Sequence, residues 1–99
     1  MLESINNIEG FIIGIIDCNG FVSNKLVCHA VAYNLHCIGE SAYKLSREFV
    51  KSHTDVDWQA IEGLRHVLVH DYYTVNFSRV WQIVTNDIQP LKEWIIAHS

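Results

Sequence analysis

Apolar residues recur at intervals of three and four positions along almost the whole chain, whereas the alternation typical of β-strands is absent. Near the N-terminus this series consists of Ile5, Ile8, Ile12 and Ile15. Further apolar side chains follow on a neighbouring face, at Phe11, Ile13 and Ile16. A helix over this segment has more apolar surface than one packing partner can cover. The periodicity therefore predicts an all-α protein whose first helix offers apolar surface for pairing with a second chain.

The longest apolar series predicts a second helix that begins at Ser23 or Asn24 as N-cap. Its members are Val31, Leu35, Ile38, Ala42, Leu45 and Phe49. Asn19 and Gly20 are typical of a helix end, so we expect a break before this helix. Gly39 lies in its middle, where glycine costs about 1 kcal/mol relative to alanine. We interpret this glycine as a point where another stretch of backbone approaches closely.

A polar segment at 51–57 separates this helix from a third one. Asp57, or Thr54 together with Asp57 three residues later, is expected to cap a helix that begins at Trp58. The side chains predicted to face the core are Ile61, Leu64 and Leu68. This third helix is predicted to end between residues 71 and 73.

Two C-terminal helices are predicted over about 77–84 and 88–96, with Asn86 or Asp87 as the cap between them. The only proline, Pro90, falls in the first turn of the last helix, where its missing N–H does little harm. Short connections favour antiparallel neighbours, and 99 residues suffice for one core only. The expected architecture is an up-and-down bundle of four or five helices that forms a single domain over residues 1–99.

The charge balance limits the kinds of partner that the chain can bind. Seven Lys and Arg against eleven Asp and Glu give a net charge of −4, which argues against a broad basic face for nucleic acid but allows a small phosphate site. Three cysteines without a C-x-x-C pair favour reduced thiols over a disulfide framework or a zinc ribbon. The apolar run at 11–16 is too short to cross a bilayer. We therefore expect a cytoplasmic protein without a membrane partner.

One polar stretch, LRHVLVHDYY at 64–73, interrupts an otherwise apolar helix. In an ideal α-helix Arg65 and Tyr72 lie within about 20° of each other, whereas Arg65 and His70 differ by about 140°. Arg65 and His70 can converge if the helix loosens or if a second chain supplies one of them. A guanidinium that binds phosphate oxygens and an imidazole that transfers protons near neutral pH suit phosphoryl chemistry. RNA fits because its 2′-hydroxyl can act as the nucleophile without a metal ion.

The stretch RHVLVHDY at 65–72 resembles the RX4HXY motif of HEPN domains, specifically the HepT toxins of bacterial and archaeal toxin–antitoxin pairs. NLHCIGESAYKL at 34–45 is similar to the glycine–glutamate–alanine segment of that family's second helix, and residues 56–95 are similar to its third helix and tail. The resemblance covers most of the chain from about residue 21 onward. It implies a HEPN-like helical bundle that forms a homodimer, with the motif lining a groove at the two-fold axis.

The resemblance also implies a metal-independent endoribonuclease toxin of a type VII-like toxin–antitoxin system, with no cofactor. In such an enzyme His70 acts as general base or acid, Arg65 stabilises charge on the scissile phosphate and His66 is auxiliary. Tyr72 corresponds to the tyrosine to which a minimal nucleotidyltransferase antitoxin of the MntA type adds AMP, bringing bulk and negative charge to the groove. Glu40 is a further auxiliary candidate that could hydrogen-bond the motif of the partner chain, although a solvated helix face is the alternative. The negative net charge favours selective substrates such as tRNA.

A metal site is one alternative for the two histidines. His66 and His70 are four residues apart, a spacing at which two imidazoles can share a zinc or iron ion, and Asp71 is the only further ligand nearby. Because members of the family act without metal, we expect no metal here.

Structural and non-catalytic roles also fit the motif residues. Arg65 and His70 could form only an ion pair and a hydrogen bond inside the bundle. The main functional alternative to a ribonuclease is a non-catalytic HEPN domain that presents a nucleotide or a substrate to a nucleotidyltransferase, and a third function is a bundle used only for assembly. His29 and His36, seven residues apart on one helix face, are expected at the surface or at an interface.

Overall fold

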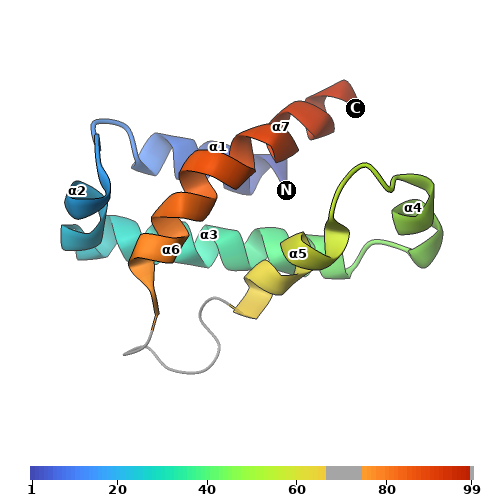
Figure 1. Cartoon of the computed structure of the whole chain (residues 1–99), viewed down its shortest axis with the longest axis horizontal. Helices are drawn as coiled ribbons and strands as arrows, with labels where there is room; N and C mark the ends of the chain where they lie inside the picture. Colours follow the sequence, from blue (N-terminus) through green and yellow to red (C-terminus); the bar gives the residue numbers. More distant parts are fainter. Residues whose placement is uncertain (67–74, 99) are drawn as a thin grey trace.

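The computed structural model describes residues 1–66 and 75–98, and all regular structure in these two ranges is helical. The N-terminal part contains α1 (Leu2–Phe11), α2 (Cys18–Ser23), α3 (Lys25–Tyr43) and α4 (Arg47–Ser52). The C-terminal part contains α5 (Trp58–Glu62), the 3₁₀-helix η1 (Gly63–His66), α6 (Phe77–Gln82), the π-helix η2 (Ile83–Asp87) and α7 (Ile88–Ala97). The predicted all-α fold class is confirmed (Figure 1).

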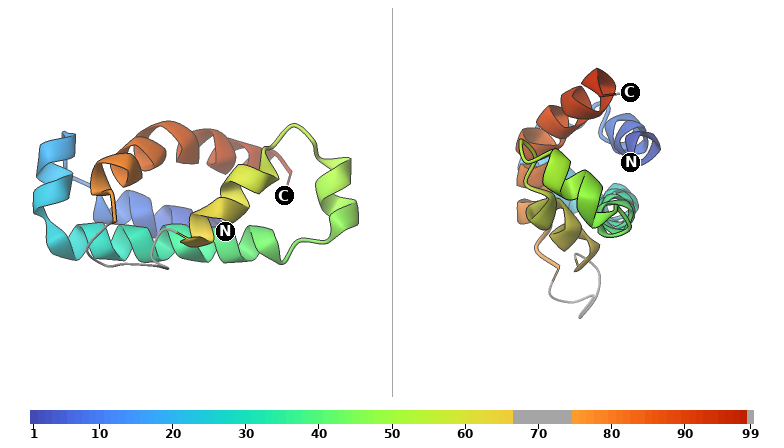
Figure 2. Two further views of the ribbon diagram at one scale, coloured as in Figure 1. Left: turned by 60° about the horizontal axis from the view of Figure 1, so that its bottom comes forward. Right: turned by 90° about the vertical axis from the view of Figure 1, so that its right-hand side faces the viewer.

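The longest described helix, α3, runs along the length of the molecule and organises the others (Figure 1). α1 and α5 pack against α3, α7 contacts α1, and α6 contacts α2 (Figure 2). The buried core includes Ile5 and Ile8 of α1, Val31, Leu35 and Ile38 of α3, Val80 of α6, and Ile88 and Leu91 of α7. None of the described helices is long and apolar enough to cross a membrane.

Two helix starts that the sequence predicts are confirmed. The Asn24 side chain caps α3 by accepting a hydrogen bond from the Val27 main-chain N–H at 3.2 Å. The Asp57 side chain caps α5 in the same way, from the Ala60 N–H at 3.1 Å. Both contacts are local, which is why a short sequence pattern is sufficient to predict them.

The first helix is shorter than its apolar series. Ile5 and Ile8 are fully buried, but α1 ends at Phe11 and the chain turns at Gly14, whose φ is +87°. Ile13 and Ile16 therefore lie in a connection and are 82% and 90% exposed.

The expected break around residues 19 and 20 is wrong, because these residues lie inside α2. Asp17 caps this helix by accepting a hydrogen bond from the Gly20 N–H at 2.7 Å. An acceptor three residues before Gly20 thus turns an expected helix end into a helix start.

The second predicted helix divides into α3 and α4. Val31, Leu35, Ile38 and Ala42 are buried as predicted, but α3 ends at Tyr43. Leu45 follows its end and Phe49 belongs to α4, so the spacing continues across a turn. The Ser46 side chain accepts a hydrogen bond from the Phe49 N–H at 3.1 Å, and this cap starts the new helix.

The C-terminal segment is continuously helical from Phe77 to Ala97, without the predicted cap between two helices. The Asp87 side chain makes no capping hydrogen bond, and the Ile88 N–H donates to the Ile83 carbonyl, a π-helical contact. A proline ring inside a helix clashes with the carbonyl four residues earlier, which here is that of Asn86. The wider π turn ends just before Pro90, so the helix continues past the proline through a local widening.

Candidate functional site

The chain crosses itself at Gly39, where η1 passes over α3. A Cβ atom added to Gly39 would lie 2.2 Å from the Arg65 main-chain nitrogen and 2.9 Å from Arg65 Cα. Only a residue without a side chain permits this separation, which confirms the close backbone approach predicted at Gly39. The main chain of Arg65 is thereby fixed directly against the helix that organises the fold.

A histidine on α3 adds a second contact at this crossing. His36 Nδ1 lies 2.5 Å from the main-chain oxygen of Arg65, and because a carbonyl oxygen only accepts, Nδ1 carries the proton. His36 Nε2 faces Glu40, with 3.9 Å between Nε2 and Oε1. The sequence predicts His36 only at the surface or at an interface and does not connect it with Arg65. Its position one turn before Gly39 is the available signal, since both residues face the same crossing segment.

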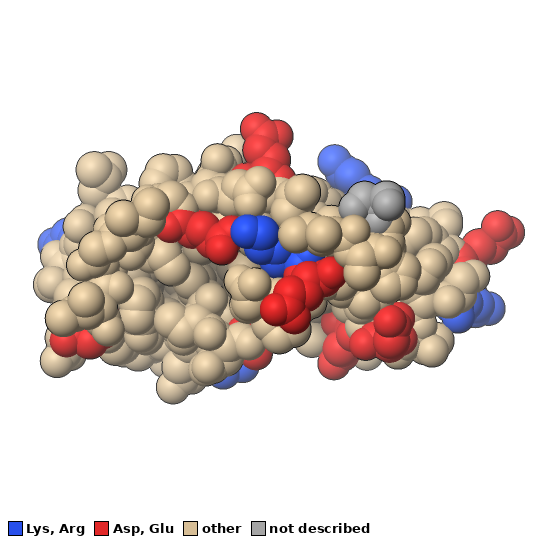
Figure 3. Space-filling view, turned by 90° about the horizontal axis from the view of Figure 1, so that it is seen from above, with Lys and Arg blue, Asp and Glu red and all other residues tan. Residues whose placement is uncertain are grey.

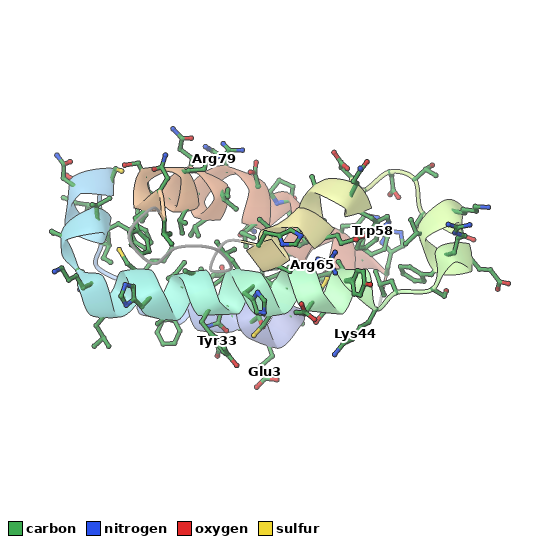
Figure 4. All side chains as sticks on the ribbon, turned by 90° about the horizontal axis from the view of Figure 1, so that it is seen from below. Glu3, Tyr33, Lys44, Trp58, Arg65 and Arg79 are labelled. Atoms are coloured by element: carbon green, nitrogen blue, oxygen red, sulfur yellow. The ribbon has the colours of Figure 1, made fainter. Side chains whose placement is uncertain are left out.

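The Arg65 side chain emerges between α5 and α3, as the labelled view in Figure 4 shows. Its Cζ atom lies 3.8 Å from the centre of the Tyr43 ring, a cation–π contact. Nη2 lies 3.7 Å from Glu62 Oε1, in a pair whose side chains are 24% and 40% exposed. A surface pair of this kind contributes little to stability, so the guanidinium can exchange the carboxylate for a phosphate.

His66 lies next to this guanidinium. Its Nε2 accepts a hydrogen bond from Arg65 Nε at 3.4 Å, so the structure brings the predicted auxiliary histidine and the predicted phosphate-binding arginine together. Glu40 lies near the crossing, with its Oε1 3.9 Å from His36 Nε2 and 41% of its side chain exposed.

Two predicted site residues, His70 and Tyr72, lie outside the described residues, as do Leu68, Asp71 and the predicted end of the third helix. The convergence of Arg65 and His70 therefore stays a prediction. Within η1, Gly63–His66, the chain turns by about 120° per residue, compared with about 100° in an ideal α-helix. Within residues 1–66 and 75–98, no three His, Cys, Asp or Glu side chains gather as metal ligands.

A cavity of about 430 Å³ lies between α5 and the η2–α7 segment. Its walls include the carboxylates of Asp55, Asp57 and Asp87, and no described lysine or arginine lines it. Asp55 Oδ2 accepts a hydrogen bond from Trp94 Nε1 at 2.7 Å at its edge. Because these carboxylates repel phosphate, the cavity is a poor place for an RNA backbone, and the surface around Arg65 is the better candidate.

Basic side chains do not form a broad patch on the face in Figure 3, where they stand apart among acidic and uncharged ones. Arg79 lies on α6, away from Arg65 (Figure 4), and donates a hydrogen bond to Gln82. The absence of a broad basic patch on that face agrees with the net charge of −4.

The three cysteines are free. Cys28 is buried beside α2, where its thiol donates to the Phe21 carbonyl and burial raises the pKa of that thiol. On the same helix, a hydrogen bond with Cys37 raises the pKa of the Tyr33 phenol. Neither group belongs to the contacts around Arg65, so we assign them no part in the site.

Comparison with known proteins gives consistent matches. The family model described as "Ribonuclease HepT-like" matches residues 1–97. Putative RNase MJ1380 of Methanocaldococcus jannaschii is 33% identical over 94% of this chain and 84% of its own length. Putative RNase TTE0752 of Caldanaerobacter subterraneus is 31% identical over 81% of this chain and 71% of its own length. Probable ribonuclease HepT of Thermococcus cleftensis is 31% identical over 73% of this chain and 66% of its own length. No solved structure matches the chain.

Proposed function

The chain belongs to the HepT-like ribonuclease family, and on this premise we propose that it is a metal-independent endoribonuclease in which Arg65 binds the scissile phosphate. The observation that carries the proposal is the placement of Arg65. Its main chain is fixed at Gly39, while its guanidinium reaches the surface beside Tyr43 with only a weak carboxylate contact. A preorganised guanidinium of this kind can bind two phosphate oxygens at once.

The reaction uses the 2′-hydroxyl of the RNA itself. A base removes the proton of this hydroxyl, the oxygen attacks the adjacent phosphorus, and the 5′-oxygen leaves with a proton from an acid. The products carry a 2′,3′-cyclic phosphate and a 5′-hydroxyl. Arg65 neutralises the charge that grows on the non-bridging oxygens, and we assign the proton transfers to His70. His66 lies beside the guanidinium and serves as an auxiliary group.

A homodimer supplies both an acid and a base. Each chain has one motif histidine, so two copies of His70 across a two-fold groove can act on opposite sides of the phosphorus. The exposed side chains of Ile13 and Ile16 support the presence of a second chain, because isolated proteins seldom leave several large apolar groups in water. We expect Glu40 to act from the same groove.

Cleavage without metal is the first expected outcome. The purified chain should cut single-stranded RNA or tRNA at an unchanged rate in excess EDTA, because no step needs a metal ion. The measurement is gel analysis of end-labelled RNA, with the product ends identified by mass spectrometry. Products ending in 3′-hydroxyl and 5′-phosphate, or activity lost with EDTA and restored by a divalent ion, would contradict this mechanism.

Regulation by a partner is the second part of the proposal. We assign to Tyr72 the role of accepting AMP from a minimal nucleotidyltransferase antitoxin in the cytoplasm. The added phosphate would compete with RNA for the guanidinium of Arg65, because both are anions and the tyrosine belongs to the same motif. The covalent attachment of AMP to Tyr72 would thus abolish toxicity.

Co-expression with such a nucleotidyltransferase should add one or more AMP units to the chain and relieve growth arrest. The Tyr72→Phe variant should still arrest growth and should stay unmodified, since the phenylalanine ring has no hydroxyl to modify. Intact-mass and peptide mass spectrometry measure both results. If the chain neither arrests growth nor cleaves RNA but forms a stoichiometric complex with the nucleotidyltransferase, it is instead a non-catalytic binding domain.

A further inference from the structure

We propose that Tyr43 is a stacking site for an unpaired nucleobase of the RNA, next to the phosphate that Arg65 binds. This inference rests on the proposed ribonuclease function and narrows its substrate class to RNA with an unpaired nucleotide beside the bound phosphate. It concerns the exposed ring at the end of α3, which none of the assigned roles uses.

The Tyr43 ring is accessible to solvent although Arg65 packs against it. Tyr43 is 54% exposed, whereas Trp58, also close to the site in sequence, is only 6% exposed. Trp58 packs edge-on against Phe49 and Trp94, with ring centres 5.8 and 5.2 Å away. None of the ring–ring contacts in the described part of the chain includes Tyr43. An aromatic ring thus faces solvent beside the phosphate site.

The guanidinium of Arg65 organises this ring for a base. Cζ of Arg65 lies 3.8 Å from the ring centre, so the arginine covers one face of Tyr43 and holds the ring in place. A base on the open face would continue the stack, and base–aromatic stacking contributes about 1–3 kcal/mol per base. Because the same arginine binds the phosphate, the base site and the phosphate site adjoin, as base and phosphate do within a strand.

Charge near Tyr43 favours a neutral base over a second phosphate. Glu40 lies one turn earlier on α3, and Glu62 lies 3.7 Å from Arg65. Once Arg65 holds one phosphate, these carboxylates repel a second phosphate but not an uncharged ring. A base can reach Tyr43 only if it leaves its neighbours in the strand, which single-stranded loops and ends allow and a continuous duplex does not.

A double-mutant cycle tests the stacking. The His70→Ala chain, which is expected to bind RNA without cutting it, serves as the background. It is titrated with a short single-stranded RNA and with abasic versions of that RNA, each of which lacks the base at one position. Fluorescence anisotropy measures the affinity for each RNA. In this background Tyr43→Leu should weaken binding of the intact RNA by about tenfold or more, equivalent to about 1.4 kcal/mol. For one abasic RNA the same substitution should have no further effect.

Two controls separate stacking from support of the arginine. Tyr43→Phe should bind like the parent, because stacking needs the ring and not the hydroxyl. Tyr33→Leu removes another exposed tyrosine of α3, 59% exposed, and should leave binding unchanged. If Tyr43→Leu weakens binding of intact RNA and of every abasic RNA equally, Tyr43 only supports Arg65 and the proposal is wrong. An unchanged affinity in Tyr43→Leu would also overturn it.

The readouts keep the two proposals apart. Stacking is measured as binding in a chain that is not required to cut, whereas the ribonuclease function is measured as cleavage by the unmodified chain. If binding depends on the contact between Tyr43 and one base but no RNA is cleaved, the ribonuclease function is rejected and the stacking site is retained.

Discussion

Replacing Gly39 with alanine is expected to lower the free energy of unfolding by about 2 kcal/mol and to reduce RNA cleavage about 100-fold. The added Cβ would lie 2.2 Å from the Arg65 nitrogen, a main-chain atom that cannot rotate away. Alanine gains about 1 kcal/mol in helix propensity, but overpacking against backbone costs up to about 3 kcal/mol. The overlap between the added Cβ and the Arg65 nitrogen is relieved only if η1 moves away from α3, and Arg65 then moves with η1.

Urea unfolding followed by circular dichroism measures the stability of the Gly39→Ala variant, and initial cleavage rates measure its activity. Gly10→Ala is a matched control, because Gly10 also lies within a helix but no neighbouring atom lies within 4 Å of an added Cβ. The control should be as stable as the parent or slightly more stable. A Gly39→Ala chain with full stability and activity would show that the crossing does not position Arg65.

Replacing Arg65 with alanine is expected to reduce kcat/KM for RNA cleavage by about 10² to 10³ while the fold persists. The loss follows from removing the positive charge that faces the non-bridging oxygens. The fold should persist because the Arg65 side chain contacts only Glu62, His66 and Tyr43 at the partly exposed edge of the crossing, and ion pairs near the surface contribute about 1 kcal/mol or less. Its fixed main chain does not depend on the side chain.

Single-turnover cleavage and thermal unfolding of Arg65→Ala should be compared with two other variants. Arg65→Lys keeps the charge but loses the two parallel N–H donors, so its rate should fall between those of the parent and of the alanine variant. Arg79→Ala removes an exposed arginine far from the crossing and should cleave at the parental rate. Equal losses in the Arg65 and Arg79 variants would indicate a general charge effect instead of a specific phosphate contact.

Much of the helical pattern could be predicted because it depends on residues close together in sequence. Asn24 and Asp57 cap helices through contacts three residues away, and the burial of Leu35 follows from its spacing. Family membership could be recognised from the motif that includes Arg65.

The remaining features depend on distant contacts or on competition between local signals. His36 meets the main chain of Arg65 across 29 residues, and no local pattern encodes that pairing. Ser46 begins a separate helix where periodicity alone would continue the first one, because capping outweighs spacing there. The π turn before Pro90 depends on how the chain accommodates a proline ring, which hydrophobic spacing does not reveal.

Because of the crossing at Gly39, substitutions elsewhere in the bundle can change stability without moving Arg65. Backbone touches backbone there, and Leu64, the residue before Arg65, also packs against the core, so apolar side chains that do not touch this crossing have little effect on the position of the arginine. Substitutions among those side chains can raise or lower the melting temperature while the arginine keeps its place. A laboratory selection for heat resistance could therefore alter much of the interior and leave the placement of Arg65 unaltered, provided that this one position stays free of a side chain.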